Sequence, residues 1–219
     1  MGERLGDILP RLGIYFLGVL LVSFGIVSCV HSELGISPIS SIPYVLSQLT
    51  PWTLGEMTMG FHLANTAFQY LMERRLINVR LLLQVPVAWI FSLAIDGMQA
   101  LWALPEGGTA VSCALLAASI VSTALGMHLM LSADLVQNPP DGTVRLLASV
   151  HGRKVGTMKV AYDICCIVAS SALALLFQGP LSAFGAATIA SALLVGRCLT
   201  FFRAHLDVCA RAKAAPVQA

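Results

Sequence analysis

Charged side chains are scarce in this chain of 219 residues. They make up 11% of it, whereas about 25% is usual for a soluble domain. With 57% hydrophobic residues, the chain has more apolar surface than a soluble fold can bury. Three stretches lack Asp, Glu, Lys and Arg and exceed the roughly 20 residues that cross a bilayer: Leu12–Ser32, Gly107–Ala133 and Ile164–Gly196. The composition therefore predicts an integral membrane protein in contact with the lipid bilayer.

The sequence also lacks the motifs of most chemical sites. No nucleophile elbow, phosphate-binding loop or HExxH motif is present. The six cysteines show neither CxxC nor Cys/His metal-site spacing. The net charge of +2 is too small and too scattered to indicate nucleic acid as a partner. We therefore expect no enzymatic activity, no catalytic residues, no metal site, no cofactor and no nucleic-acid partner.

Apolar stretches bounded by charges and by Gly/Pro breaks predict six membrane-spanning helices. The first stretch is too long for a cleaved signal peptide and has no small-residue cleavage site. The expected fold class is all-α, a polytopic protein with one membrane domain over residues 1–219. The six predicted helices are Leu12–Val30, Leu54–Met72, Leu81–Leu101, Thr109–Leu131, Val155–Phe177 and Leu181–Phe202.

The positions of Lys and Arg give an independent check on this topology, because cytoplasmic loops carry the excess of positive charge. The loops around Glu33, Glu106 and Gly179-Pro180 contain neither residue. Every basic segment then falls on one side of the membrane, and both termini are expected in the cytoplasm. The basic residues outside the predicted helices are Arg4, Arg11, Arg74, Arg75, Arg80, Arg145, Arg153, Lys154, Arg203, Arg211 and Lys213.

A constant offset of 101 residues relates the second half of the sequence to the first. The halves cover residues 12–105 and 113–206. Each contains three predicted spans, an odd number, so the second half must enter the membrane from the opposite side. This arrangement is an inverted repeat, which is common among secondary transporters. The matched pairs include Gly25 with Gly126, Leu34 with Leu135, Pro38 with Pro139, Leu46 with Leu147, Gly55 with Gly156, Met57 with Met158 and Phe61 with Tyr162.

Proline-rich stretches occupy corresponding places in the two halves, and each predicts a helix too short to span, over residues 37–49 and 139–150. If these helices re-enter the membrane, their first N–H groups face the middle of the protein and a ligand. The alternative is a pair of surface helices, with Arg145 toward lipid headgroups. Ser40 corresponds to Asp141, so a central site would be electrically asymmetric.

Ionisable residues within spans are functional candidates, because charge is expensive to bury in lipid. His62 and Asp163 correspond under the offset, and each lies about 12 Å along its helix, near the middle of the membrane. A pair there could bind a cation or carry a proton; the alternative is a structural pair, or separate hydrogen bonds to the backbone. Lys159 either neutralises Asp163 or extends to the surface, and we favour the surface. Asn65 could add a hydrogen bond.

Asp96 and Arg197 also correspond under the offset. Asp96 lies far along a helix that leaves the cytoplasmic side, and Arg197 lies far along one that approaches it. We therefore expect them near opposite faces, as interface anchors or gate residues and not as a charge pair.

Short glycine-rich motifs run along nearly the whole chain: Gly18–Ile26, Leu34-Gly35-Ile36-Ser37-Pro38, Leu54-Gly55, Pro140-Asp141-Gly142, Val155-Gly156, Ala187-Thr188 and Leu194-Val195-Gly196. In this order they resemble the bacterial YczE/YyaS type of small integral membrane protein, which is related to the YitT group. The resemblance implies an inner-membrane location and a multi-span fold, and it brings no established substrate. Ser40, where relatives are expected to be more polar or acidic, and Val136, where the repeat predicts glycine, depart from the pattern.

The expected function is a small secondary transporter that alternates access to a central site between its inverted halves. The alternatives are a membrane scaffold or accessory subunit, whose polar residues only join helices, and a channel. A homodimer is compatible with the small volume that six spans enclose. The expected substrate is a small molecule or an ion, bound by His62, Asp163, Ser37, Ser40, Asp141, Thr143 and Asn65.

Overall fold

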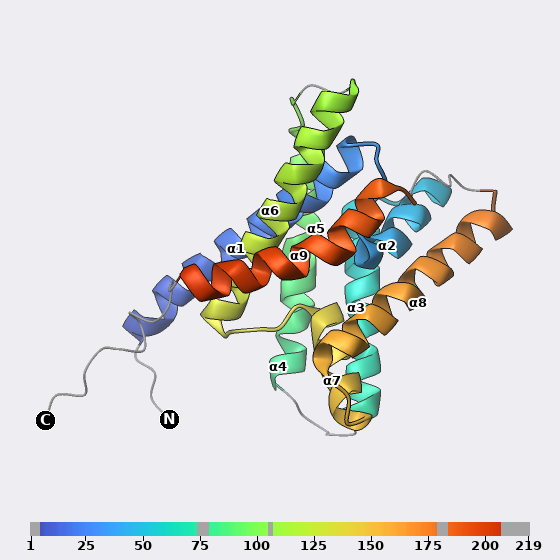
Figure 1. Ribbon diagram of the computed structural model, residues 1–219. Helices are drawn as coiled ribbons and strands as arrows, with labels where there is room; N and C mark the ends of the chain where they lie inside the picture. Colours follow the sequence, from blue (N-terminus) through green and yellow to red (C-terminus); the bar gives the residue numbers. More distant parts are fainter. Residues whose placement is uncertain (1–4, 74–78, 105–106, 179–183, 207–219) are drawn as a thin grey trace, which may run out of the picture.

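The computed structural model describes residues 5–73, 79–104, 107–178 and 184–206. The regular structure in these ranges is helical, as the sequence predicts (Figure 1). The helices are α1 (Leu5–His31), α2 (Pro38–Leu49), α3 (Leu54–Glu73), α4 (Val79–Leu82), α5 (Gln84–Ala100), α6 (Thr109–Ala133), α7 (Pro139–Val150), α8 (Val155–Leu176) and α9 (Ala186–His205).

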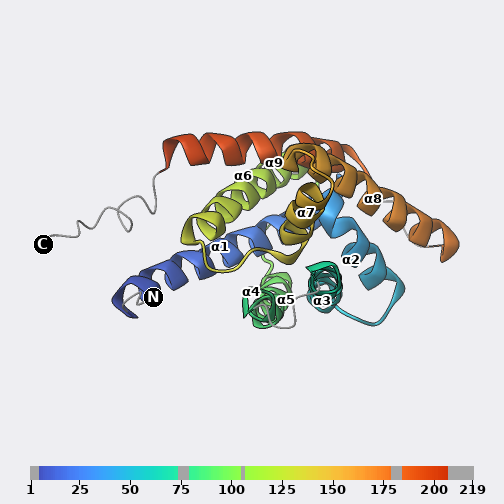
Figure 2. The same ribbon diagram turned by 90° about the horizontal axis from the view of Figure 1, so that it is seen from below.

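Helices α1 and α6 form the central antiparallel pair of the bundle. Arg11 Nε near the beginning of α1 donates to the carbonyl oxygen of Ala133 at the end of α6, at 2.9 Å. In the middle of the pair, Ser122 Oγ donates to the carbonyl oxygen of Leu21 at 2.8 Å. Figure 2 shows α9, α6 and α1 stacked in that order, with α3 and α5 seen end-on beyond α1. The other helices are therefore arranged around this pair.

Glycines allow the backbones of α1 and α6 to meet. A Cβ atom added at Gly126 would lie 2.6 Å from the carbonyl oxygen of Gly18. A Cβ atom added at Gly25 would lie 2.9 Å from the carbonyl oxygen of Ser119. The two contacts correspond under the 101-residue offset, because Gly25 matches Gly126 and Gly18 matches Ser119. Small residues at such contacts let membrane helices approach closely enough for backbone packing.

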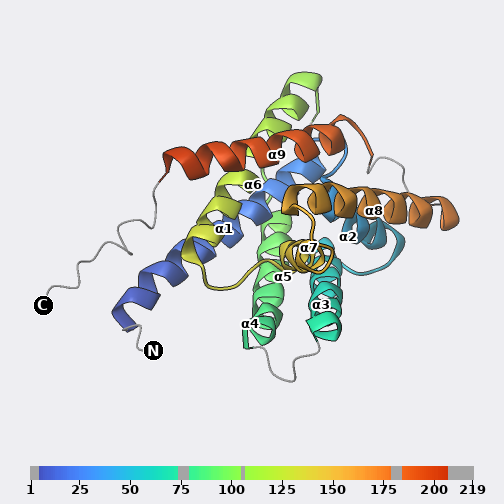
Figure 3. The ribbon, with the colours of Figure 1, turned by 60° about the horizontal axis from the view of Figure 1, so that its bottom comes forward.

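The two short helices begin at the predicted prolines. Helices α2 and α7 each have 12 residues and start at Pro38 and Pro139. Each packs against a long helix of the other half, α2 against α8 and α7 against α3. Figure 3 shows α7 beside α3 and α2 beside α8. Two contacts therefore join the halves, and each is made by a short helix of one half and a long helix of the other.

The third and last helices of each half pack differently. Helix α3 runs beside α5, where Gly55 lies directly against the carbonyl oxygen of Ser92. Helix α8 packs mainly on α2 and α7, while α9 packs mainly on α6. Gly156, which corresponds to Gly55, has no atom within 4 Å across the described ranges, chain neighbours and its own helix backbone aside. Helices α3 and α5 of the first half therefore pack closely together, whereas α8 and α9, the helices at the corresponding places in the second half, do not.

Within the described ranges, four helices are long and apolar enough to cross a membrane: α6, α8, α9 and the segment Ile8–His31 of α1. The chain is therefore a multi-pass membrane protein. Spans at α3 and α5 stay predictions. Helix α5 has only 17 residues, and α3 buries a polar face that includes His62 and Gln69.

Three predicted helix starts differ from those observed. The first predicted helix starts at Leu12, but α1 already begins at Leu5. The third predicted helix starts at Leu81, but α4 ends at Leu82 and α5 starts at Gln84, whose side chain is buried. The last one starts at Leu181, which lies outside the described residues, and α9 starts only at Ala186. There the N–H of Gly185 is capped by Thr188 Oγ1 at 3.3 Å. Hydropathy does not detect such contacts, so the boundaries shifted.

The two ends of the bundle differ in charge. The beginning of α1 and the ends of α6 and α9 meet at one end, where His128 Nε2 lies 2.9 Å from the carbonyl oxygen of Leu206. We call this the basic end, defined by Arg11, Arg145 and Arg203. The opposite end joins α1 to α5, where the rings of His31 and Trp102 stack at 4.3 Å.

The variant Gly126→Ala tests the contact between α1 and α6. Its methyl group would lie 2.8 Å from the Val22 backbone nitrogen, so the helices must separate. We expect a loss of about 1–3 kcal/mol, measured by thermal unfolding in detergent. The matched control is Gly196→Ala in α9, which has no described atom nearby. The control should be neutral or gain up to about 1 kcal/mol through helix propensity. Equal behaviour of the two variants would contradict the contact.

Candidate functional site

The centre of the polar interior is the side chain of Gln69 on α3. Its Nε2 atom donates to the carbonyl oxygen of Pro139 at 2.9 Å and lies 3.3 Å from Thr143 Oγ1. It also lies 3.4 Å from Gln84 Oε1, which accepts from Thr66 Oγ1 at 2.8 Å. One amide therefore joins α3, the start of α5 and the start of α7. The predicted site residue Thr143 belongs to this network.

The start of α7 fits around this amide because of Gly142. A Cβ atom added there would lie 2.6 Å from Gln69 Oε1. The pyrrolidine rings of Pro139 and Pro140 occupy the first helical positions and are fully buried. Glycine at this position thus leaves room for the long side chain from α3.

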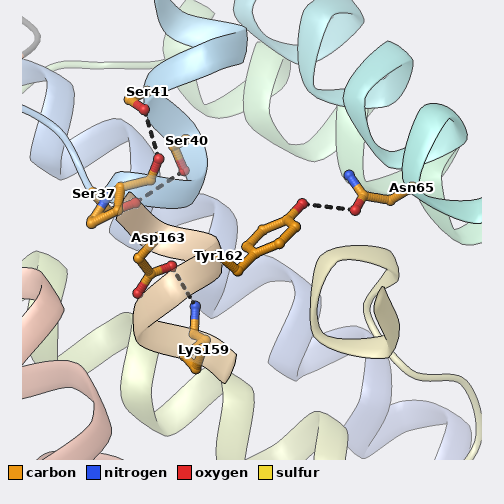
Figure 4. Close-up of polar contacts among 8 residues, drawn as sticks. Ser37, Ser40, Ser41, Asn65, Lys159, Tyr162 and Asp163 are labelled. Carbon is orange, nitrogen blue, oxygen red and sulfur yellow. Dashed lines mark hydrogen bonds and ion pairs between the residues drawn. The ribbon is translucent and has the colours of Figure 1, made fainter. Parts of the chain in front are cut away.

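The start of α2 has a smaller polar contact with α8. Ser170 Oγ donates to Ser41 Oγ at 2.9 Å, and Ser41 Oγ donates to the carbonyl oxygen of Pro38 at 2.6 Å. Nearby, Ser37 Oγ donates to Ser40 Oγ at 3.1 Å (Figure 4). The structure therefore brings the predicted residues Ser37 and Ser40 together at the first turn of α2.

Asn65 joins α3 to α8. Its Oδ1 atom accepts a hydrogen bond from the hydroxyl of Tyr162 at 2.7 Å (Figure 4). Its Nδ2 atom donates to the carbonyl oxygen of Phe61 at 2.9 Å. Asn65 lies in the first half and Tyr162 in the second, so this hydrogen bond joins the two halves. The predicted residue Asn65 is thus part of the polar interior.

Asp163 is paired with Lys159 on its own helix. The distance from Nζ to Oδ1 is 3.1 Å, and the Asp163 side chain is 13% exposed. The preferred expectation that Lys159 extends to the surface is therefore wrong, because the pair lies one helical turn apart and bonds locally. Figure 4 shows this pair on α8, near Ser37, the residue that precedes α2.

His62 lies apart from that pair. Its ring is 3% exposed and packs edge-on against Phe91 of α5 at a centroid distance of 5.3 Å. Its Nδ1 atom has no hydrogen-bond partner among the described residues. The ion pair of Asp163 is with Lys159 instead. A direct pair of His62 and Asp163 is therefore not a feature of this arrangement.

Asp96 and Arg197 follow the expectation that they do not pair. The carboxylate of Asp96 accepts from Thr53 Oγ1 at 2.6 Å and from the Gly55 backbone N–H at 2.8 Å. It thereby fixes the beginning of α3 to α5. Arg197 is exposed on α9.

A cavity of about 430 Å³ opens at the basic end. Met127 and Met130 of α6 form part of its apolar wall, and Gln84 ties it to the Gln69 network. Asp141 lines the cavity and has no hydrogen-bond or ion-pair partner in the described part of the chain. Asp141 is thus the predicted site residue that the cavity exposes to a ligand. Within the described ranges, no three His, Cys, Asp or Glu side chains are placed to hold a metal ion.

Sequence reasoning missed Gln69, Gln84 and Tyr162. The signal for Gln69 was available, because buried polar residues recur on one face of α3 at helical spacing: Thr58, His62, Asn65, Thr66 and Gln69. Gln84 and Tyr162 have no comparable signal, since their partners come from other helices.

The variant Gln69→Leu tests the network. It keeps similar volume but leaves the Gln84 amide and the Pro139 carbonyl without their partner. Unsatisfied buried polar groups cost about 1–3 kcal/mol, so we expect a clear drop in the thermal unfolding temperature in detergent. The control is Gln99→Leu, which changes the same side chain at an exposed position of α5. A drop in the control as large as that of Gln69→Leu would exclude a specific role for the network.

Comparisons with known proteins place this chain without naming an activity. Neither the curated proteins nor the solved structures contain a match. One family model matches residues 9–204, which is most of the chain. The chain therefore belongs to DUF6198, a family of unknown function.

Proposed function

We propose that this protein is a small secondary transporter with a central site between two inverted halves. The observation that carries the proposal is the pair of short helices, each of which starts at a proline and packs on the long helix of the other half. Broken or short helices at corresponding places in two halves are the usual marker of a transport site.

Several contacts support the inverted repeat. Helices α2 and α7 each have 12 residues and begin 101 residues apart. Helices α3 and α8 also begin 101 residues apart. Ser122 and Leu21, which bond to each other, are also 101 residues apart. A residue that contacts its own counterpart lies beside a pseudo-twofold axis. The axis of the proposed repeat therefore passes between α1 and α6.

The cavity supplies the proposed route to the site. Its volume of about 430 Å³ falls within the usual range for small-molecule sites, roughly 300–1,000 Å³. It reaches the first turn of α7 through Asn138 and Asp141, and Gln84 connects it to the network around Thr143 and Asn65. A small molecule or ion entering here meets Asp141 first.

The remaining proposed ligand residues lie deeper or on the other half. Ser37 and Ser40 present hydroxyl groups at the start of α2, and Asp163 lies on the facing helix α8. The Nδ1 atom of buried His62, which has no hydrogen-bond partner among the described residues, also suits a proton acceptor or donor. These residues would complete the site when the halves rearrange.

The basic end suits the cytoplasmic side, because Lys and Arg accumulate in cytoplasmic loops. With this orientation the cavity opens to the cytoplasm and both termini lie there. The resemblance to the YczE/YyaS type implies a bacterial inner-membrane location, and both belong to the same proposal.

A membrane scaffold is the second candidate. The observation in its favour is that Gln69 is fully engaged by protein groups, as a purely structural link would be. A scaffold needs no carboxylate without a partner in a cavity, whereas Asp141 has no partner among the described residues.

The deciding experiment is a thermal-shift screen of the purified protein against amines, amino acids, organic anions and metal ions at two pH values. A ligand at 100 times its dissociation constant stabilises the native state by about 2.7 kcal/mol. We expect such a shift to disappear in Asp141→Asn and to persist in Glu56→Gln, a carboxylate at the other end of the bundle that caps the Thr53 N–H. The absence of any shift in the native protein would count for the scaffold.

A further inference from the structure

The two ends of the bundle are not equally closed. At the opposite end, the loop after α1 packs against the start of α9: a Cβ atom added at Gly35, whose φ is +105°, would lie 2.7 Å from the Gly185 nitrogen. The Ala187 N–H donates to the carbonyl oxygen of Leu34 at 2.9 Å. This backbone contact, the seal, joins Leu34 and Gly35 to Gly185 and Ala187.

The basic end cannot form the same seal. Under the 101-residue offset, Ala187 corresponds to Pro86, which has no N–H to donate to the carbonyl oxygen of Leu135. Gly35 corresponds to Val136, whose side chain takes the space that the glycine leaves free. Leu135 and Val136 line the cavity instead.

A second contact also exists in one half only. In the first half, Asp96 accepts from Thr53 Oγ1 and from the Gly55 N–H, and so it ties α3 to α5. In the second half the counterpart of Asp96 is Arg197, a cation that cannot accept hydrogen bonds. Gly156, the counterpart of Gly55, faces open space in the described structure. We call the contact of Asp96 with Thr53 and Gly55 the latch.

We propose that the latch at Asp96 holds the opposite end shut, and that its release lets α3 part from α5 while α9 docks at Gly156 and closes the cavity. The inference rests on the inverted repeat proposed above, because it exchanges the packing of the two halves. A glycine inside a helix lowers its stability, and at Gly55 the missing Cβ atom is used for close packing. If α9 docks at Gly156, the missing Cβ atom of this glycine likewise permits close packing of two helices.

The test uses two reporter cysteines at corresponding positions, Ser37→Cys near the seal and Asn138→Cys in the cavity. Each is placed in a protein whose six natural cysteines are replaced by alanine. A membrane-impermeant maleimide is applied to either side in right-side-out and inside-out vesicles. We expect Asn138→Cys to react quickly from the cavity side and Ser37→Cys to react slowly from both sides.

Adding Asp96→Asn should reverse this pattern. We expect Ser37→Cys to react about tenfold faster and Asn138→Cys correspondingly slower, as a loss of about 1.4 kcal/mol from the latch would produce. The matched control is Glu56→Gln, next to Gly55 in the first turn of α3. The described side-chain bond of Glu56 comes from the Thr53 N–H, which a glutamine oxygen can still accept, so the bonds of Asp96 stay in place. The control should leave both rates unchanged. Two unchanged rates in Asp96→Asn, or two rates that rise together, would overturn the proposal.

A second variant guards against a merely loosened fold. Gly156→Leu should have no effect in the arrangement described, since no described atom lies near it, but it should block docking of α9. Combined with Asp96→Asn, it should return both labelling rates to their original values. No change on adding Gly156→Leu would overturn the docking. Labelling needs no ligand, so it tests the latch separately from the transport function. If Asp96→Asn changes the two labelling rates in opposite directions but the protein binds nothing in the thermal-shift screen, the latch is upheld and the transport function is rejected.

Discussion

The close approach of α1 and α6 is the contact on which the rest of the structure depends. In lipid there is little hydrophobic force between helices, so packing and interhelical hydrogen bonds must hold them together. Gly25 and Gly126 bring two backbones together, and Ser122 bonds across the middle of the pair. Helix α5 then packs on α1, and α9 packs on α6, each beside its own half. The short helices are left to connect the halves.

The two contacts between halves, α7 with α3 and α2 with α8, fill the space between their helices with side chains of different sizes. Where α7 meets α3, a glycine at position 142 faces the long side chain of Gln69. Where α2 meets α8, the corresponding positions hold Ser41 and Ser170, two side chains of equal and intermediate size. Both pairs fill the gap and satisfy the polar groups there, but only the first extends to α5 and to the cavity. The two corresponding contacts therefore differ in how many helices their hydrogen bonds join.

Sequence patterns predicted the local features of this fold well. Proline positions gave the beginnings of α2 and α7, because proline fixes the first helical turn whatever lies around it. The ion pair of Asp163 and the start of α9 were predicted incorrectly, since each depends on a bond that hydropathy does not record. Tyr162 was missed as a site residue because its partner is 97 positions away in the chain. Pairing across helices is a property of packing, and one sequence alone does not display it.

The double proline at the start of α7 has an electrostatic consequence. An ordinary helix start attracts anions through its free amide hydrogens. Pro139 and Pro140 have no amide hydrogen, and the next residue, Asp141, adds a negative charge. The first turn of α2, by contrast, keeps its amides after Pro38 and adds the hydroxyls of Ser37 and Ser40. The two helix starts thus differ in charge, because the start of α7 carries a carboxylate and lacks two amide hydrogens, whereas the start of α2 carries hydroxyls and no charged side chain.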